Sequence, residues 1–374
     1  MLILKKTVET AYTYFLQEIY KINPFKEKNP KRILFFRQGM IGDFIICLPS
    51  MIAIRDRYPN SQFIVCANPI VKSICPKGME FIPIKADEVN LNVIINVLKK
   101  DPDYIVDFSS TTTSLIISTF GLVAGANRID ILSEITREKW IEKSKENIHW
   151  VDYHKKILEK YSIESNKIRP NIELEKEDIY WAKEFLNENK INGKFIVIFP
   201  GSSHPKCRWN WNNFATVVRY FNKKYQIVMV CSKGDLETCQ KINKSVNINS
   251  PILVDFELRK LSAIFSLSEL YVGMDSGITH LAAASKSPVL SIFTAGYAYT
   301  WYPYTPVGFA AFVPEYHLQN GIDQSAVNKG DEAFGVIDVN IIIQKCEELI
   351  TTDKKALKED KLVPFNGIAF HSKL

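Results

Sequence analysis

The chain has 374 residues, of which 46% are hydrophobic and 24% are charged, and its formal net charge is +6. This composition excludes an intrinsically disordered chain, and the length exceeds the size at which one hydrophobic core stops growing, so we expect two domains. The modest positive charge suits a phosphorylated ligand or an anionic membrane surface. It is too small to indicate a nucleic-acid-binding protein.

The cysteines and the apolar segments bear on the compartment. The seven cysteines form no C-x-x-C pair, a pattern that predicts reduced, buried thiols and neither a zinc site nor a disulfide framework. No apolar run is long enough to span a bilayer, and the N-terminus lacks a signal-peptide core. We therefore expect a cytoplasmic protein.

The first 30 residues contain a predicted helix from Thr7 to Ile22 that is rich in aromatic and basic side chains. Such a helix suits a membrane surface. The favoured interpretation is a helix packed on the first domain, because apolar helix faces usually meet a protein core. Pro24 and Pro30 end this segment.

The next part of the chain, residues 31–170, alternates apolar strand-like runs with helical periodicity, as in a parallel sheet covered on both faces. Pro49 is expected to kink or delay one of the helices. The predicted strands are residues 32–37, 62–67, 81–84 and 104–108, and the predicted helices are residues 44–57, 89–100 and 115–123. A charged insertion over residues 131–160 and a connecting helix at 152–161 follow.

The same alternation of predicted strands and helices restarts in residues 171–350 and ends before a tail at 351–374. Predicted strands are residues 194–199, 226–231, 252–254, 269–273 and 288–293, and predicted helices are residues 177–189, 213–223, 258–266 and 339–350. Two α/β halves of similar build predict two Rossmann-like domains. In such sheets ligands bind outside the carboxyl ends of the strands.

Three motifs follow strand ends. Gly39-x-x-Gly42-Asp43 comes after the first strand, and its glycines allow a sharp turn and close approach of a bulky ligand. Asp43 is a candidate general base or a helix cap. Around residues 271–284, a strand, a turn and a helix start form an anion site, with a plain helix cap and a buried histidine as the alternative. The third motif is the loop at residues 200–210.

These three motifs, in this order and spacing over residues 32–350, resemble glycosyltransferase family 9, the lipopolysaccharide heptosyltransferases. The resemblance implies a GT-B architecture, with two Rossmann-like domains facing across a cleft, the acceptor on the first and the nucleotide-sugar on the second. It implies an inverting enzyme without a metal ion or cofactor. The implied donor is ADP-heptose, and the implied acceptor is the Kdo or heptose of the lipopolysaccharide inner core.

The resemblance also assigns roles to individual residues. Asp43 matches the general base, with Gly39 and Gly42 in the acceptor loop. The donor diphosphate and sugar would be bound by Ser202, Ser203, Lys206, Asp275, Ser276, Gly277, Ile278 and His280. One departure leaves the phosphate cation open, because Cys207 stands where the family has its lysine, so Arg208 is an alternative to Lys206. Phe256 and Glu237 are weaker nucleoside candidates, and a surface role for Glu237 is the favoured interpretation.

The acceptor would be selected by residues 109–113, Arg128 and the insertion, where charges could meet Kdo carboxylates or lipid A phosphates. The expected partners are thus a nucleotide-sugar and a lipopolysaccharide acceptor, with peripheral contact at the cytoplasmic face of the inner membrane and no nucleic acid. Two alternatives stay open at this point. One is the same fold with another nucleotide-sugar, and the other is a non-catalytic member that binds a glycan precursor.

Overall fold

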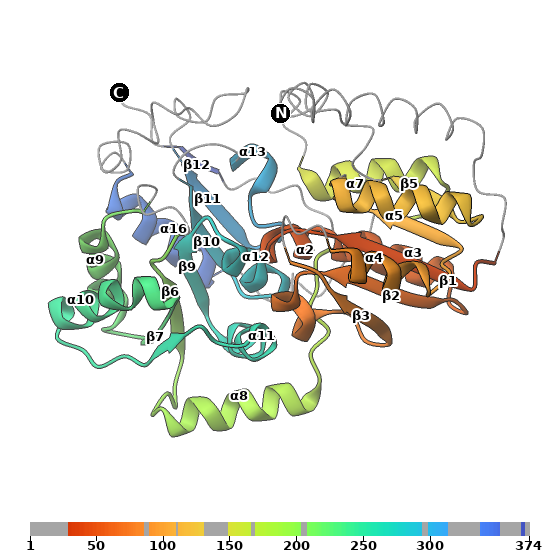
Figure 1. Cartoon of the computed structure of the whole chain (residues 1–374). Coiled ribbons are helices and arrows are strands. Elements are labelled where there is room, and N and C mark those ends of the chain that lie inside the picture. The colour runs from red at the N-terminus through yellow and green to blue at the C-terminus, as the bar shows by residue number, and fades with distance from the viewer. Residues whose placement is uncertain are drawn as a thin grey trace, which may run out of the picture. The chain divides into compact units, whose positions relative to one another are not determined.

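The computed structural model describes residues 29–85, 90–109, 111–130, 149–165, 169–202, 208–293, 298–312, 337–351 and 368–370. The predicted helix at residues 7–22 lies outside this set. The chain divides into two compact units, each built on one parallel sheet (Figure 1). The first unit contains Met1–Trp140 and Tyr153–Ile168, and the second contains Ile141–Asp152 and Arg169–Leu374. The second unit thus takes in residues 141–152 as well as the part of the chain from Arg169 onward.

The first unit has a five-stranded sheet with strand order β3-β2-β1-β4-β5, and every neighbouring pair is parallel. Its strands are β1 (Arg32–Arg37), β2 (Gln62–Ala67), β3 (Met79–Pro83), β4 (Tyr104–Asp107) and β5 (Asn127–Asp130). Strand β1 is central, and its four middle residues are fully buried, which explains its unbroken apolar sequence. The helical segments are α2 (Ile41–Ile45), α3 (Leu48–Arg57), η1 (Pro69–Ile74), α4 (Leu91–Leu98), α5 (Thr112–Val123) and α7 (Trp150–Lys160).

The helix predicted at residues 44–57 is in fact two helices, α2 and α3. Pro49 lies in the first turn of α3, where its missing N–H costs nothing because that group would have no partner inside the helix. The chain therefore ends one short helix at Ile45 and starts another at Leu48. As a result Asp43 lies on a five-residue helix that directly follows the loop at the end of β1.

The second unit has a seven-stranded sheet with order β12-β11-β10-β9-β6-β7-β8. Its strands are β6 (Phe195–Phe199), β7 (Gln226–Cys231), β8 (Ile252–Val254), β9 (Leu270–Met274), β10 (Val289–Ile292), β11 (Gly308–Phe312) and β12 (Ile368–Phe370). The last two strands were not predicted, and β12 belongs to the segment that we assigned to a tail. Two parallel, helix-covered sheets confirm the predicted α/β class.

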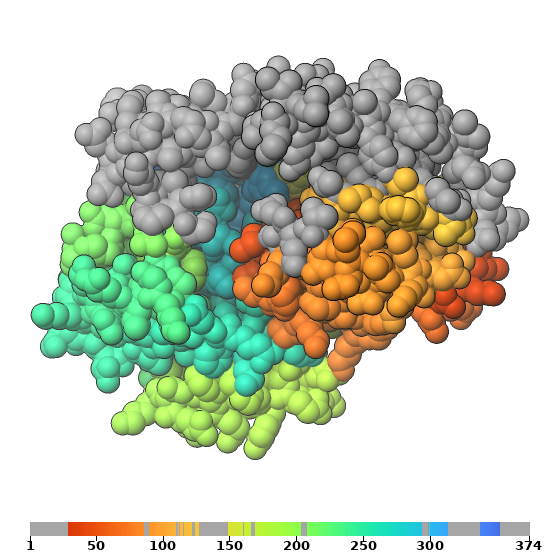
Figure 2. Space-filling view, viewed as in Figure 1, coloured from red at the N-terminus to blue at the C-terminus, as the bar shows by residue number. Residues whose placement is uncertain are grey.

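The helical segments of the second unit are α8 (Lys176–Glu188), α9 (Trp211–Phe221), η3 (Lys233–Asp235), α10 (Leu236–Val246), α11 (Leu258–Leu267), α12 (Gly277–Ala284), α13 (Ala298–Trp301) and α16 (Val339–Thr351). Helix α8 lies at the surface of this unit (Figure 2), and Tyr180 on it is 68% exposed. None of the described helices is both long enough and apolar enough to cross a membrane.

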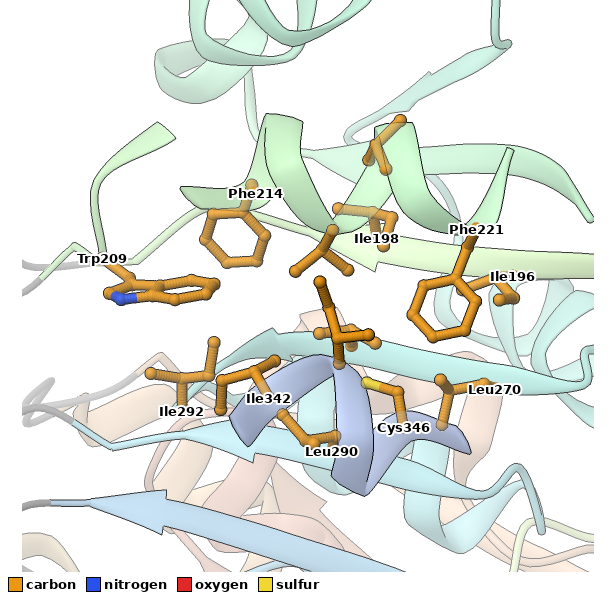
Figure 3. Packing of buried hydrophobic residues seen from close by; sticks show 14 of the residues in the cluster. Ile196, Ile198, Trp209, Phe214, Phe221, Leu270, Leu290, Ile292, Ile342 and Cys346 are labelled. Atoms are coloured by element: carbon orange, nitrogen blue, oxygen red, sulfur yellow. The ribbon is translucent and has the colours of Figure 1, made fainter. Parts of the chain in front are cut away.

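The core of the second unit lies between its sheet and the helices α9 and α16 (Figure 3). Trp209 packs edge-on against Phe214, with ring centroids 5.1 Å apart, and Ile342 and Cys346 contribute from α16. Because only 2% of Trp209 is exposed, the chain just before α9 is anchored in this core. The described end of the loop at 200–210 is therefore fixed next to the carboxyl edge of the sheet.

Candidate functional site

The Asp43 carboxylate is held on both oxygen atoms at the carboxyl end of β1. Its Oδ1 lies 2.6 Å from Nη2 of Arg37, and its Oδ2 accepts a hydrogen bond of 2.8 Å from the Met40 amide. The bond from Met40 caps α2, so the capping alternative describes part of what Asp43 does. The side chain is nevertheless 28% exposed, and each carboxylate oxygen has a further lone pair. Asp43 can therefore cap a helix and still accept a proton.

Gly39 packs directly against this carboxylate. A Cβ atom at position 39 would lie 2.9 Å from Cβ and 3.0 Å from Oδ2 of Asp43, closer than real side chains approach. Gly42 is buried at the start of α2. The structure thus brings Gly39, Gly42 and Asp43 together, and the missing side chain at position 39 is what lets the Asp43 carboxylate lie this close to the loop.

The loops predicted to select the acceptor are linked through Gln38. Its amide Nε2 donates to the carbonyl of Lys85 at 2.8 Å, and its Oε1 accepts from the Thr111 hydroxyl at 2.9 Å. Ser109 in turn donates its backbone N–H to Asp107. These bonds join the ends of β1, β3 and β4 at one edge of the sheet. Arg128 lies in β5, and residues 131–148 of the predicted insertion lie outside the described residues.

In the second unit, the turn after β9 has the predicted strand, turn and helix form. The Ser276 hydroxyl caps α12 by accepting the Thr279 N–H at 3.3 Å, and the Thr279 hydroxyl donates to the Met274 carbonyl. The Tyr271 hydroxyl lies 3.1 Å from the Thr279 oxygen. This buried network shapes the turn, while the backbone at Gly277 and Ile278 forms the first turn of an eight-residue helix, where N–H groups favour an anion.

Asp275 directly precedes this helix and is half-buried. Burial raises the pKa of its carboxyl from 3.8 to about 7. At neutral pH the group is therefore partly protonated and can either donate or accept a hydrogen bond, which suits contact with the hydroxyl groups of a sugar.

This raised pKa predicts a pH-dependent stability. Between pH 3.8 and about 7 the folded state holds a proton that the unfolded state releases, so stability falls as the pH rises through this window. We expect Asp275→Asn to remove that contribution, which would flatten the melting temperature measured against pH across this range. The exposed Asp255, replaced by Asn, is the control. Parallel curves for Asp275→Asn and the wild-type protein would contradict the prediction.

His280 is 4% exposed and lies one turn into α12. Its ring meets that of Trp301 on α13 nearly edge-on, with centroids 6.0 Å apart. The structure therefore positions His280 in an aromatic contact next to the helix start, and its hydrogen bond to a donor phosphate stays a prediction.

The loop after β6 is tied to the loop after β7 by an ion pair. Nη2 of Arg208 lies 2.6 Å from Oδ1 of Asp235. The same nitrogen donates a hydrogen bond of 3.2 Å to the carbonyl oxygen of Ser202. The Ser232 hydroxyl donates to Oδ2 of Asp235 at 2.7 Å. Gly201 is required beside this pair, because a Cβ there would lie 2.5 Å from Oδ2. Ser203 and Lys206 lie outside the described residues.

The two nucleoside candidates lie in different settings. Phe256 packs in an aromatic cluster with Trp181 and Phe185 of α8, at centroid distances of 6.1 and 5.3 Å. The Glu237 side chain is 78% exposed and pairs with Lys241 one turn along α10, and this contact lowers its pKa. This is the surface setting that we favoured for Glu237.

Two residues of the site were missed. Arg37 ends an apolar strand, and a charge at the end of a buried strand just before Gly39-x-x-Gly42-Asp43 was a usable signal. Asp235 is 3% exposed, and a buried carboxylate needs a partner. Nothing in the sequence pairs it with Arg208. Among the described residues, no group of three or more His, Cys, Asp or Glu side chains could hold a metal ion.

Comparisons with known proteins agree with the motifs. The family model of glycosyltransferase family 9 (heptosyltransferase) matches residues 132–328, just over half of the chain. Lipopolysaccharide heptosyltransferase 3 of Escherichia coli K12 is 25% identical over 168 residues, which are 44% of this chain and 48% of that protein. The matched part thus spans about half the length of that relative.

Solved structures share the fold. A glycosyltransferase family 9 protein from Veillonella parvula DSM 2008 is 17% identical with a TM-score of 0.68, covering 88% of this chain and 99% of that one. The E. coli ADP-heptose lipopolysaccharide heptosyltransferase II is 16% identical with a TM-score of 0.62, covering 86% and 99%. At such identities the likeness extends to the fold alone, the GT-B architecture of two Rossmann-like domains. Together with the family model, the motifs and the two sheets establish that this chain belongs to glycosyltransferase family 9.

Proposed function

We propose that the protein is an inverting, metal-independent glycosyltransferase that moves heptose from ADP-heptose to the inner core of lipopolysaccharide, onto a Kdo or heptose acceptor. The observation that carries this proposal is the Asp43 carboxylate. It lies at the carboxyl edge of the first sheet, with both oxygen atoms held in place and 28% of the side chain exposed. A single positioned base of this kind is what an inverting transfer needs.

The reaction follows from that placement. Asp43 takes the proton from the acceptor hydroxyl while the hydroxyl oxygen attacks the anomeric carbon of the donor. The bond from that carbon to the diphosphate oxygen breaks, ADP leaves from the opposite face, and the anomeric configuration inverts. The products are the extended glycan and ADP, and the proton of the acceptor hydroxyl ends on Asp43.

The second unit is assigned the donor. Its sheet places β9, β6 and β7 side by side, so the loops that follow them share one carboxyl edge. There the start of α12, with Ser276, Gly277 and Ile278, would bind the diphosphate, and Ser202, Ser203 and Lys206 would supply further hydroxyl groups and a cation. Asp275 would bind the sugar hydroxyls. The Arg208 side chain is already paired with Asp235, which favours Lys206 as the phosphate cation.

The donor and the place of action rest on relatives. The E. coli relative described above is an ADP-heptose lipopolysaccharide heptosyltransferase, which supports ADP-heptose as the donor here. An acceptor of this kind is carried by lipid A, so we assign the protein to the cytoplasmic face of the inner membrane. No cofactor is needed beyond the nucleotide-sugar.

Two measurements test the proposal together. The purified protein is offered ADP-, GDP- and UDP-sugars with truncated lipopolysaccharide, and the lipopolysaccharide of a strain lacking the gene is analysed by mass spectrometry. We expect turnover with ADP-heptose and the loss of one heptose from the inner core. Turnover with a different nucleotide-sugar would show that this other sugar nucleotide is the donor. The absence of turnover with every donor would indicate a non-catalytic glycan-binding protein.

A further inference from the structure

Arg37 is the last residue of β1, and its side chain is only 11% exposed. Its guanidinium reaches two anchors at once. Nη2 lies 2.6 Å from Oδ1 of Asp43, and Nη1 donates to the backbone carbonyl of Phe108. The Phe108 carbonyl is itself fixed, because the Phe108 amide bonds to Phe36 where β4 runs beside β1. The guanidinium therefore ties the Asp43 side chain to the rigid part of the sheet.

Two titratable side chains near Arg37, other than Asp43, are uncharged. His154 on α7 is buried, and burial together with the nearby Arg37 charge lowers its pKa to about 3, so the ring is neutral. Burial raises the pKa of the Cys47 thiol to about 12, so this neighbour is neutral as well. Among the described residues, Asp43 is the carboxylate that pairs with Arg37. Such a pair, shielded from water, holds its geometry more firmly than an exposed one.

The two oxygen atoms of Asp43 thus differ. Oδ1 is engaged by the guanidinium of Arg37. Among the described residues, Oδ2 accepts only the neutral Met40 N–H, and it lies close to Gly39, where a side chain would clash with it. Oδ2 therefore keeps a lone pair that can accept the proton of an incoming hydroxyl group.

We propose that Arg37 is a positioning residue for the transfer reaction: its two-point bond to Asp43 and Phe108 orients the carboxylate so that Oδ2 receives the acceptor proton. This rests on the proposed function, in which Asp43 is the base. In this proposal Arg37 acts on the reaction through Asp43. Its effect on rate arises because a base displaced by about 1 Å can lose on the order of a hundredfold in rate.

The test compares Arg37→Ala and Arg37→Lys with a control on the same strand. The control is Arg32→Ala, because Arg32 lies at the other end of β1 and bonds to the Lys100 carbonyl. We expect Arg37→Ala to lower kcat by roughly a hundredfold while the donor KM changes little, since the donor is assigned to the other unit. Arg37→Lys keeps the charge without the second anchor, so its kcat should be intermediate.

Chemical rescue separates positioning from a merely structural role. Guanidinium chloride at low concentration should recover part of the kcat of Arg37→Ala and leave Arg32→Ala unchanged. Wild-type kcat in Arg37→Ala would overturn the proposal. A second result would also overturn it: a lower kcat in Arg37→Ala that is accompanied by a lower melting temperature, is not restored by guanidinium and is equally low in Arg37→Lys. If Arg37→Ala does not fold, Arg37→Lys decides: kcat and donor KM both at wild-type values would overturn the proposal.

Asp43→Ala, measured in parallel, keeps the two proposals apart. Full activity in Asp43→Ala would show that Asp43 is not the base and would rule out the proposed mechanism. Loss of activity in Asp43→Ala together with full activity in Arg37→Ala would leave that mechanism standing and overturn only the role of Arg37.

Discussion

Asp43→Asn is expected to abolish heptose transfer while ADP still binds within a few fold of the wild-type affinity. Asn keeps the size of Asp and an oxygen that can accept from Met40 or Arg37, but it cannot take up a proton at neutral pH. Loss of a general base typically lowers kcat by about 10²–10⁴-fold. The measurement is product formation at saturating donor, with ADP affinity from calorimetry.

The matched control is Asp56→Asn on α3, where the carboxylate is 63% exposed and pairs with the neighbouring Arg55. Its kcat should equal that of the wild-type protein. The melting temperature of Asp43→Asn must also be followed, because the substitution leaves the Arg37 charge without a carboxylate. Retained transfer in Asp43→Asn would show that this residue is a helix cap and an ion-pair partner, and that the base lies elsewhere.

Asp235→Ala is expected to destabilise the second unit by about 3–5 kcal/mol, because it leaves the half-buried Arg208 charge without its partner. It also removes the acceptor of the Ser232 hydroxyl bond, so the loops after β6 and β7 lose their connection. Urea unfolding followed by circular dichroism measures the change in the free energy of unfolding.

Two further variants complete this comparison. Glu237→Ala, two residues along the chain at an exposed position, should change stability by no more than about 0.5 kcal/mol. The double variant Asp235→Ala/Arg208→Ala should recover part of the loss, since it removes the unpaired charge together with the carboxylate. Equal stability of Asp235→Ala and the wild-type protein would mean that the Arg208 pair contributes nothing, and Arg208 would again be as good a phosphate cation as Lys206.

Periodicity predicted the strands whose side chains are buried on both faces. The apolar runs at β1, β2 and β6 are long enough that burial alone explains them, and their predicted bounds match the observed ones to within a residue. Strand β5 has the sequence Asn-Arg-Ile-Asp and strand β11 is Gly-Phe-Ala-Ala-Phe, neither of which carries a strand signal of its own. Their pairing is imposed by the neighbouring strands, and single-sequence propensity does not contain that information.

The residues of the candidate site also differ in whether the sequence alone could predict them. Gly39, Asp43 and the run from Asp275 to His280 could be recognised because their chemistry depends on local spacing at a strand end. The residues of the ion pair Arg37–Asp43 are only 6 positions apart, whereas the pair Arg208–Asp235 joins two loops, 27 positions apart in sequence, that only the folded sheet brings together. Only the second distance is beyond local pattern analysis. The first could have been found by asking why a charged residue ends a buried strand.

Strand β12 has a consequence for shortening the chain. Ile368–Phe370 pair in parallel with β11, so these three residues cover the outer edge of the second sheet. A protein ending at residue 351 would leave the N–H and C=O groups of β11 open along that side, and an open strand of Ala and Phe residues is a template for pairing with another molecule. We therefore expect that removal of Ile368–Phe370 would expose β11 as an edge strand and favour aggregation.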